Sequence, residues 1–72
     1  MSPKLPVISG YQAVKALSKF GFAPVRQHGD HLVMQKGVIV FSVPLHRTLK
    51  KGTLLAILKQ ANISKEEFVG KL

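Results

Sequence analysis

Cysteine is absent from the 72 residues of this chain. The absence excludes a disulfide framework, thiolate chemistry and any metal site built on cysteine. No apolar run approaches the roughly 18 residues that a membrane-spanning helix needs. The first six residues, Met1 to Pro6, also lack the apolar core of a signal peptide. We therefore expect a cytoplasmic protein with no membrane partner.

Acidic residues are almost absent as well. Asp30, Glu66 and Glu67 are the only carboxylate side chains, against 11 Lys and Arg, and the formal net charge is +8. A surface of one sign attracts polyanions, which include nucleic acid, an anionic membrane and an acidic protein. The alternative is a solvated basic face that only aids solubility. The one-signed excess favours nucleic acid or an acidic partner.

Aromatic residues are few, with one tyrosine, four phenylalanines and no tryptophan. We expect most of them in the core, so the sequence gives little support to a base-stacking platform for single strands. Hydrophobic residues make up 46% of the chain. This content allows one core, and we expect residues 1–72 to form a single small domain that buries about 60% of its unfolded surface.

Helical patterns lie at both ends of the chain. Ser9 can cap a first helix that ends near Phe20. Apolar residues recur at i, i+3, i+4 and i+7 in a second helix, from Lys50 or Lys51 to Ala61 (residues 50–61). Ser64 and Glu67 have the spacing of a capping box for a short last helix.

Three β-prone runs lie between these helices, at residues 22–27, 31–36 and 38–43. The segments 28–30 and 36–37 predict tight turns, which favour an antiparallel meander. Pro24 indicates an edge position for the first strand, and Pro44 ends the third. The expected fold is α+β, of order α-β-β-β-α, with a three-stranded antiparallel sheet packed on helices and a short C-terminal helix.

His31 follows the first turn and opens the second predicted strand, which gives its imidazole a rigid mount beside an exposed site. A neutral imidazole can take the proton of a ribose 2′-OH, and an imidazolium can protonate a leaving 5′-oxygen. Such cleavage needs no metal, because the 2′-OH is an internal nucleophile. His31 is therefore the candidate catalytic residue of an RNA-cleaving enzyme. The alternative is a surface histidine that is hydrogen-bonded to the turn.

Neighbouring polar residues could support His31. Asp30 could orient the ring, could repel an incoming phosphate, or could stand there only because Asp suits turns. His28 could be an acid–base partner or a phosphate contact, or an exposed loop residue. His46 could contact substrate or transfer a second proton, provided that its strand lies beside that of His31. A metal site of His28, His31 and His46 would lack metal-specific spacing, so we expect no metal and no cofactor.

Basic residues gather before the second predicted helix, at Arg47, Lys50 and Lys51. Free N–H groups at a helix N-terminus and flanking lysines together form an anion site. Double-stranded-RNA-binding domains similarly set a lysine-rich helix start against phosphates. We assign Arg26 and Lys36 to the same RNA-binding set. The alternative is a solvated charge cluster.

The order and spacing of three segments resemble one bacterial family, at Arg26–His31, Val43–His46 and Gly52–Gln60. The chain from residue 5 to residue 68 resembles the HicA toxins, also called YcfA-like, which are mRNA interferases of HicA–HicB toxin–antitoxin pairs. The family usually has Ser where this chain has Asp30, and often Arg or Lys where it has His28.

The resemblance implies a fold like that of a double-stranded-RNA-binding domain. It also implies a metal-independent endoribonuclease that cleaves mRNA with His31 as general acid or base. The implied partner is a HicB-type antitoxin, which should cover the edge at His31. Two other hypotheses stay open: a non-catalytic double-stranded-RNA-binding module, and a protein-interaction module whose basic face meets an acidic protein. Only catalysis requires an imidazole at position 31.

Overall fold

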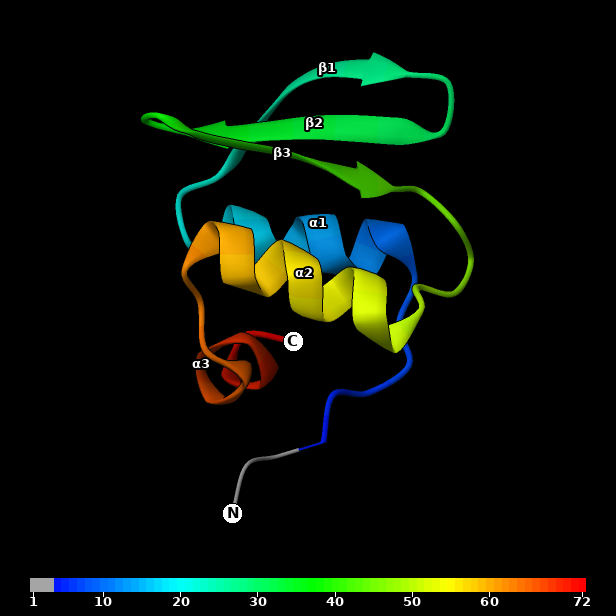
Figure 1. Ribbon diagram of the computed structural model, residues 1–72, viewed down its shortest axis with the longest axis vertical. Coiled ribbons are helices and arrows are strands. Elements are labelled where there is room, and N and C mark those ends of the chain that lie inside the picture. The colour runs from blue at the N-terminus through cyan, green and yellow to red at the C-terminus, as the bar shows by residue number, and fades with distance from the viewer. Residues whose placement is uncertain (1–3) are drawn as a thin grey trace.

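The computed structural model describes residues 4–72. The first half of the segment Met1 to Pro6, for which no signal peptide was expected, lies outside the described residues. The structural elements are α1 (Gly10–Ser18), β1 (Ala23–His28), β2 (His31–Lys36), β3 (Ile39–Pro44), α2 (Lys51–Ala61) and α3 (Lys65–Gly70) (Figure 1). The predicted order, with its short C-terminal helix, is confirmed. The arrangement is the α+β layout of a double-stranded-RNA-binding domain.

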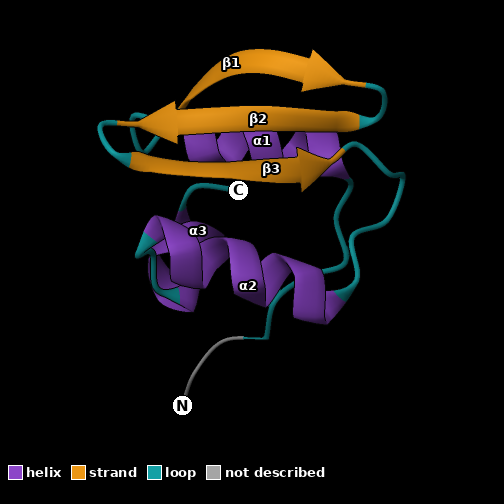
Figure 2. Cartoon of the chain, turned by 45° about the horizontal axis from the view of Figure 1, so that its top comes forward, coloured by secondary structure: helices purple, strands orange, loops and turns teal. Residues whose placement is uncertain are grey.

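The three strands form one antiparallel sheet in the order β1-β2-β3. Gly29 and Gly37 follow the first and second strands with φ of 57° and 60°. Glycine adopts such positive angles at little cost, which allows the tight connections between strands. Strand β1 lies at an edge, as Pro24 predicted, and its register shifts between Pro24 and Arg26. All three helices lie on one side of the sheet (Figures 1 and 2).

Helix α1 begins as predicted but ends earlier. Ser9 and Gln12 form a capping box, with bonds of 3.1 Å and 2.9 Å between side chain and backbone. The helix ends at Ser18 rather than near Phe20. The N–H groups of Phe20 and Gly21 bond to carbonyls three residues earlier, which tightens the last turn, and Gly21 then takes φ of 93°.

The connection between helices α2 and α3 contains a residue in the left-handed backbone conformation. Asn62 ends α2 with φ of 59° and ψ of 43°, a conformation that asparagine tolerates better than most residues. Ser64 and Glu67 then make both bonds of the predicted capping box, each 3.1 Å long. In one bond the N–H of Ser64 donates to the carboxylate of Glu67, and in the other the N–H of Glu67 donates to the hydroxyl of Ser64. The bonds to Ser64 lower the pKa of the Glu67 carboxyl.

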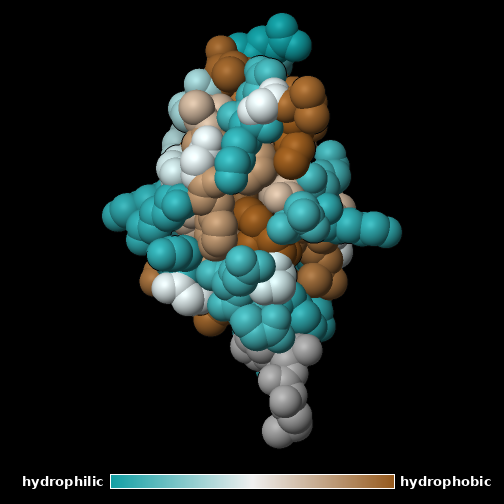
Figure 3. All heavy atoms as spheres, turned by 90° about the vertical axis from the view of Figure 1, so that its left-hand side faces the viewer, coloured by the Kyte–Doolittle hydropathy of each residue, from teal (hydrophilic) through white to brown (hydrophobic). Residues whose placement is uncertain are grey.

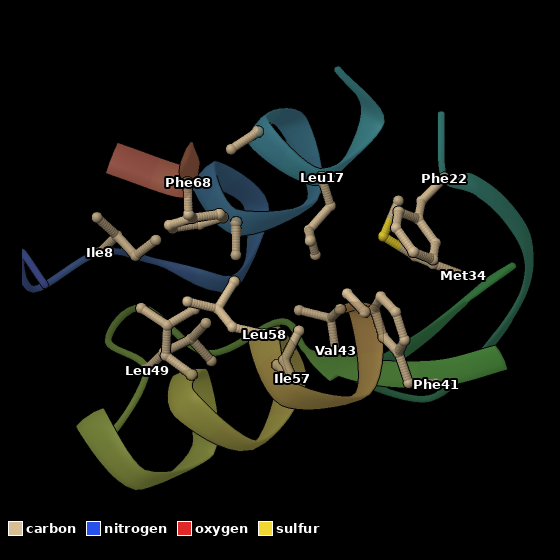
Figure 4. Close-up of a cluster of buried hydrophobic side chains, with 14 residues drawn as sticks. Ile8, Leu17, Phe22, Met34, Phe41, Val43, Leu49, Ile57, Leu58 and Phe68 are labelled. Atoms are coloured by element: carbon tan, nitrogen blue, oxygen red, sulfur yellow. The ribbon is translucent and has the colours of Figure 1, made fainter. Parts of the chain in front are cut away.

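The core lies between the sheet and the helix layer, and Figure 4 shows its 14 buried hydrophobic residues. Leu17, Val43 and Phe68 are fully buried, and they come from α1, β3 and α3. Among the described residues, no buried side chain is polar or charged. Most of the phenylalanines lie in this core as expected, whereas Tyr11 is 66% exposed. No helix within residues 4–72 has the length and apolarity to cross a membrane.

Candidate functional site

Segments far apart in the sequence meet at one end of the molecule. The β1–β2 turn, the loop from β3 to α2 and the N-terminal ends of α1 and α2 all lie at the right of Figure 1. Backbone hydrogen bonds join them. The N–H of Leu45 donates to the carbonyl of Asp30 at 2.6 Å, and the N–H of Gly10 donates to the carbonyl of His46 at 2.9 Å. The loop after β3 is therefore held against both the turn and the first helix.

The start of α1 approaches this loop so closely that only glycine fits at position 10. A Cβ atom on Gly10 would collide with the carbonyl oxygen of Pro44 and lie 2.7 Å from the Cα of Leu45. Both are backbone atoms, so no side-chain rotation could relieve the overlap. Gly10 was not among the predicted site residues; its one signal in the sequence is that glycine is an unfavourable residue in the first turn of a helix.

Asp30 bridges two histidines. One carboxylate oxygen, Oδ1, lies 2.9 Å from Nδ1 of His31, and the other, Oδ2, lies 2.9 Å from Nε2 of His46. The two rings are 6.2 Å apart between centroids and inclined by 75°. The side chains of Asp30, His31 and His46 are 60%, 50% and 54% exposed. We call these three residues the histidine cluster, and solvent reaches all three side chains.

The bridge determines which ring nitrogens remain free. An ionised carboxylate only accepts hydrogen bonds, so Nδ1 of His31 and Nε2 of His46 must be the donors. That leaves Nε2 of His31 and Nδ1 of His46 to exchange protons with a substrate. The hydrogen bond from His46, followed by that from His31, holds the pKa of the Asp30 carboxyl below its ordinary value of 3.8. Asp30 is therefore a carboxylate throughout the neutral range.

His28 lies next to this cluster without joining it. It pairs with His31 across the hairpin, and Arg26 pairs with Val33. Directly paired residues point to the same side of a sheet. Met34 of β2 faces the buried core, so His31 and Val33, together with their partners, lie on the face away from the helices. Within residues 4–72, the carboxylate of Asp30 forms ion pairs with His31 and His46, and His28 is not among its partners.

The basic residues Arg47, Lys50 and Lys51 come within five positions after His46 and are exposed, in the loop and helix start at the same end. Lys50 occupies the N-cap of α2 without a capping hydrogen bond from its side chain, and the first turn has no acidic residue. The free N–H groups of this turn and the positive end of the helix dipole therefore add to the lysine charges. The surface beside the histidine cluster is suited to phosphate groups.

Lys36 is not brought to this surface, although it was assigned with the other basic residues. It ends β2, five residues beyond His31, which at about 3.3 Å per residue places it roughly 16 Å away. Its ammonium donates to the carbonyl of Phe20 at 2.7 Å and lies 5.7 Å from the ring centroid of Phe22. These contacts give Lys36 a structural role at the opposite end of the sheet.

That opposite end carries an apolar groove. It lies beside the β2–β3 turn and is lined by Phe20, Phe22, Val38, Ile39 and Ile63. Figure 3 views the molecule from this side and shows hydrophobic surface between hydrophilic groups. No group of three His, Cys, Asp or Glu residues within the described chain is arranged to hold a metal ion. The imidazoles of the histidine cluster are the described side chains best suited to proton transfer near neutral pH.

Comparison with known proteins gives one match, to a protein family. A family model described as the HicA toxin of bacterial toxin–antitoxin systems matches residues 10–63. The match spans α1, the whole sheet and α2, and so includes the histidine cluster. No curated protein and no solved structure gave a match. Because the family model covers well over half of the chain, this protein belongs to the HicA toxin family of bacterial toxin–antitoxin systems.

Proposed function

We propose that this toxin acts as a metal-independent endoribonuclease that cleaves mRNA in the cytoplasm, with His31 as its proton-transfer group. The observation that carries the proposal is the bridge from Asp30 to Nδ1 of His31. It leaves Nε2 of an exposed imidazole free on a strongly basic molecule. A histidine held in one tautomer by a carboxylate is well prepared for general acid–base catalysis.

In the proposed reaction, Nε2 of His31 takes the proton of a ribose 2′-OH. The 2′-oxygen attacks the adjacent phosphorus, and the bond from phosphorus to the 5′-oxygen breaks. The leaving 5′-oxygen receives a proton from an imidazolium. The products are one RNA fragment ending in a 2′,3′-cyclic phosphate and another beginning with a 5′-OH. No metal or cofactor is required, because the nucleophile belongs to the substrate.

The charge distribution supports RNA as the substrate. Arg47, Lys50 and Lys51 continue the chain from the histidine cluster, and Arg26 shares the outer sheet face with His31. Phosphate contacts by such residues supply most of the sequence-independent affinity for nucleic acid. We propose that the RNA backbone crosses these residues beside the cluster.

We further propose that a HicB-type antitoxin restrains the enzyme by covering the end that carries His31. Carboxylates on the antitoxin would complement the net charge of +8 and speed association. In a competition experiment, RNA binding should fall as purified antitoxin is added. Full RNA binding by the saturated complex would contradict occlusion of this site.

The test of catalysis compares His31→Ala with His28→Ala, two exposed histidines at paired positions of one hairpin. His31→Ala should lower the rate of RNA cleavage by about 10²–10⁴-fold, the usual cost of losing a general acid or base. It should also abolish growth arrest on induced expression, while its circular dichroism stays that of the wild type. His28→Ala should remain active. Equal RNA cleavage by folded His31→Ala would remove His31 from the mechanism and favour an RNA-binding or protein-binding module.

A further inference from the structure

We propose that His46 is a second catalytic residue, the general acid that protonates the leaving 5′-oxygen while His31 acts as the base. Asp30 is then the positioning residue for both rings. The proposal rests on the ribonuclease activity proposed above and goes beyond it, because it separates the two proton transfers and assigns each to a different imidazole.

The first support is the symmetry of the bridge. The two oxygens of one carboxylate each hold one histidine, both at 2.9 Å. If His46 served only to close its loop, a backbone partner would suffice, and its carbonyl already provides one by accepting the N–H of Gly10. Instead the ring is oriented by Asp30, and 54% of the side chain remains exposed. Its free nitrogen, Nδ1, is thus available for a substrate.

The second support is the separation of the rings. In an in-line displacement the attacking and leaving oxygens lie on opposite sides of the phosphorus. The base and the acid must each come within about 2.6–3.2 Å of a different oxygen. Ring centroids 6.2 Å apart place the two imidazoles side by side, so each can approach a different oxygen of one phosphodiester group that lies against both rings. One imidazole would have to move across the phosphate to serve both oxygens.

The third support is the rigidity of the mount. His31 opens a strand, and His46 lies in a loop fixed at two points by backbone bonds, from Leu45 to Asp30 and from Gly10 to His46. Catalytic groups act efficiently only when the surrounding structure holds them in the productive geometry. A close helix approach and two backbone bonds thus fix the position of the loop that carries His46.

The experiment uses two substrates that differ in their leaving group. An RNA oligonucleotide releases an alkoxide that needs a proton, whereas uridine 3′-(4-nitrophenyl phosphate) releases a phenolate that needs little help. His46→Ala should cleave the oligonucleotide about 10²-fold or more slowly, the range for a lost general acid. On the activated substrate it should approach the wild-type rate. His31→Ala should be slow on both substrates, and His28→Ala is the matched control that should stay active on both.

The outcomes separate the two proposals. A wild-type protein that cleaves neither substrate would refute the ribonuclease function itself. With an active wild type, equal losses by folded His46→Ala on both substrates would refute the acid role and leave His46 a structural residue. Full activity of His46→Ala on the oligonucleotide would also refute the inference. His46→Gln, which keeps a polar side chain, should behave as His46→Ala does if proton donation is what matters.

The positioning role of Asp30 has its own readout. In Asp30→Ala, which removes both acceptor oxygens, the ring of His31 should lose its preference for a proton on Nδ1, which the nitrogen chemical shifts of the imidazole report. The variant should lower kcat on the oligonucleotide with little change in KM. Unchanged imidazole shifts and unchanged kcat would show that Asp30 does not position His31.

Discussion

Replacing Gly10 with alanine should destabilise the protein and disturb the histidine cluster together. The new methyl group would collide with the carbonyl oxygen of Pro44 and lie 2.7 Å from the Cα of Leu45. Because both are backbone atoms, the start of α1 and the loop after β3 must separate. That loop carries His46, whose carbonyl accepts the N–H of Gly10 at 2.9 Å.

The expected size of the effect follows from opposing contributions to the free energy of unfolding. Forcing an extra carbon into a packed site costs about 1–3 kcal/mol. Weakening the hydrogen bond from Gly10 to His46 costs about 0.5–1.5 kcal/mol. Alanine regains roughly 0.5–1 kcal/mol through its higher helix propensity. The net loss should be about 0.5–4 kcal/mol, and each kcal/mol lowers the Tm of a domain of this size by roughly 4–8 °C.

A matched control is available in the other long helix. Gly52 lies in the first turn of α2, and a Cβ there would meet no atom within 4 Å. Gly52→Ala should therefore raise stability by at most about 1 kcal/mol, the propensity difference alone. Thermal and urea unfolding, followed by circular dichroism, measure both variants. The same substitution should thus move the two midpoints in opposite directions.

Cleavage of RNA by Gly10→Ala, measured well below its Tm, should also fall, because the loop that holds His46 is displaced while the protein is still folded. A Gly10→Ala protein as stable as the wild type would refute the close approach of α1 to the loop. Reduced stability with unchanged cleavage would instead show that the position of this loop does not matter for catalysis.

Three further expectations follow from the same site. Carboxyl NMR should find the pKa of Asp30 below 3.8 in the wild type and nearer 3.8 in His46→Ala, since the bond from His46 is the largest cause of the shift. The contribution of the ionised Asp30 to stability is complete at neutral pH and is lost only as the pH falls below 3.8. An identical pKa in both proteins would contradict the bridge. Lys50→Glu with Lys51→Glu should weaken RNA binding and flatten the plot of log K against log salt by about 0.7–0.9 for each phosphate that the protein no longer neutralises, whereas an unchanged slope would place the RNA elsewhere. Treatment with a chelator should leave RNA cleavage intact, and activity that one added metal restores would overturn the metal-independent mechanism.

Much of the fold was predictable because its signals are local. Ser9 and Ser64 mark helix starts through hydrogen bonds that span only three residues. Gly29 and Gly37 mark turns through their own φ angles. The end of α1 was placed too late, because tightened hydrogen bonds around Phe20 carry no distinct sequence pattern. Local physics therefore predicts that elements exist better than it predicts where they end.

The site was predictable only as a set of residues. The sequence by itself determined that the chain is basic, that Asp30 is its one carboxylate before residue 66, and that His31 follows a turn. These properties depend only on composition and on the residues of the turn. Tertiary structure decided which groups meet. Asp30 and His46 are 16 positions apart, and their contact requires β2 to pair with β3 in this register and Gly10 to admit the loop. Lys36, equally basic in sequence, lies roughly 16 Å from His31, because an extended strand separates its first residue from its last.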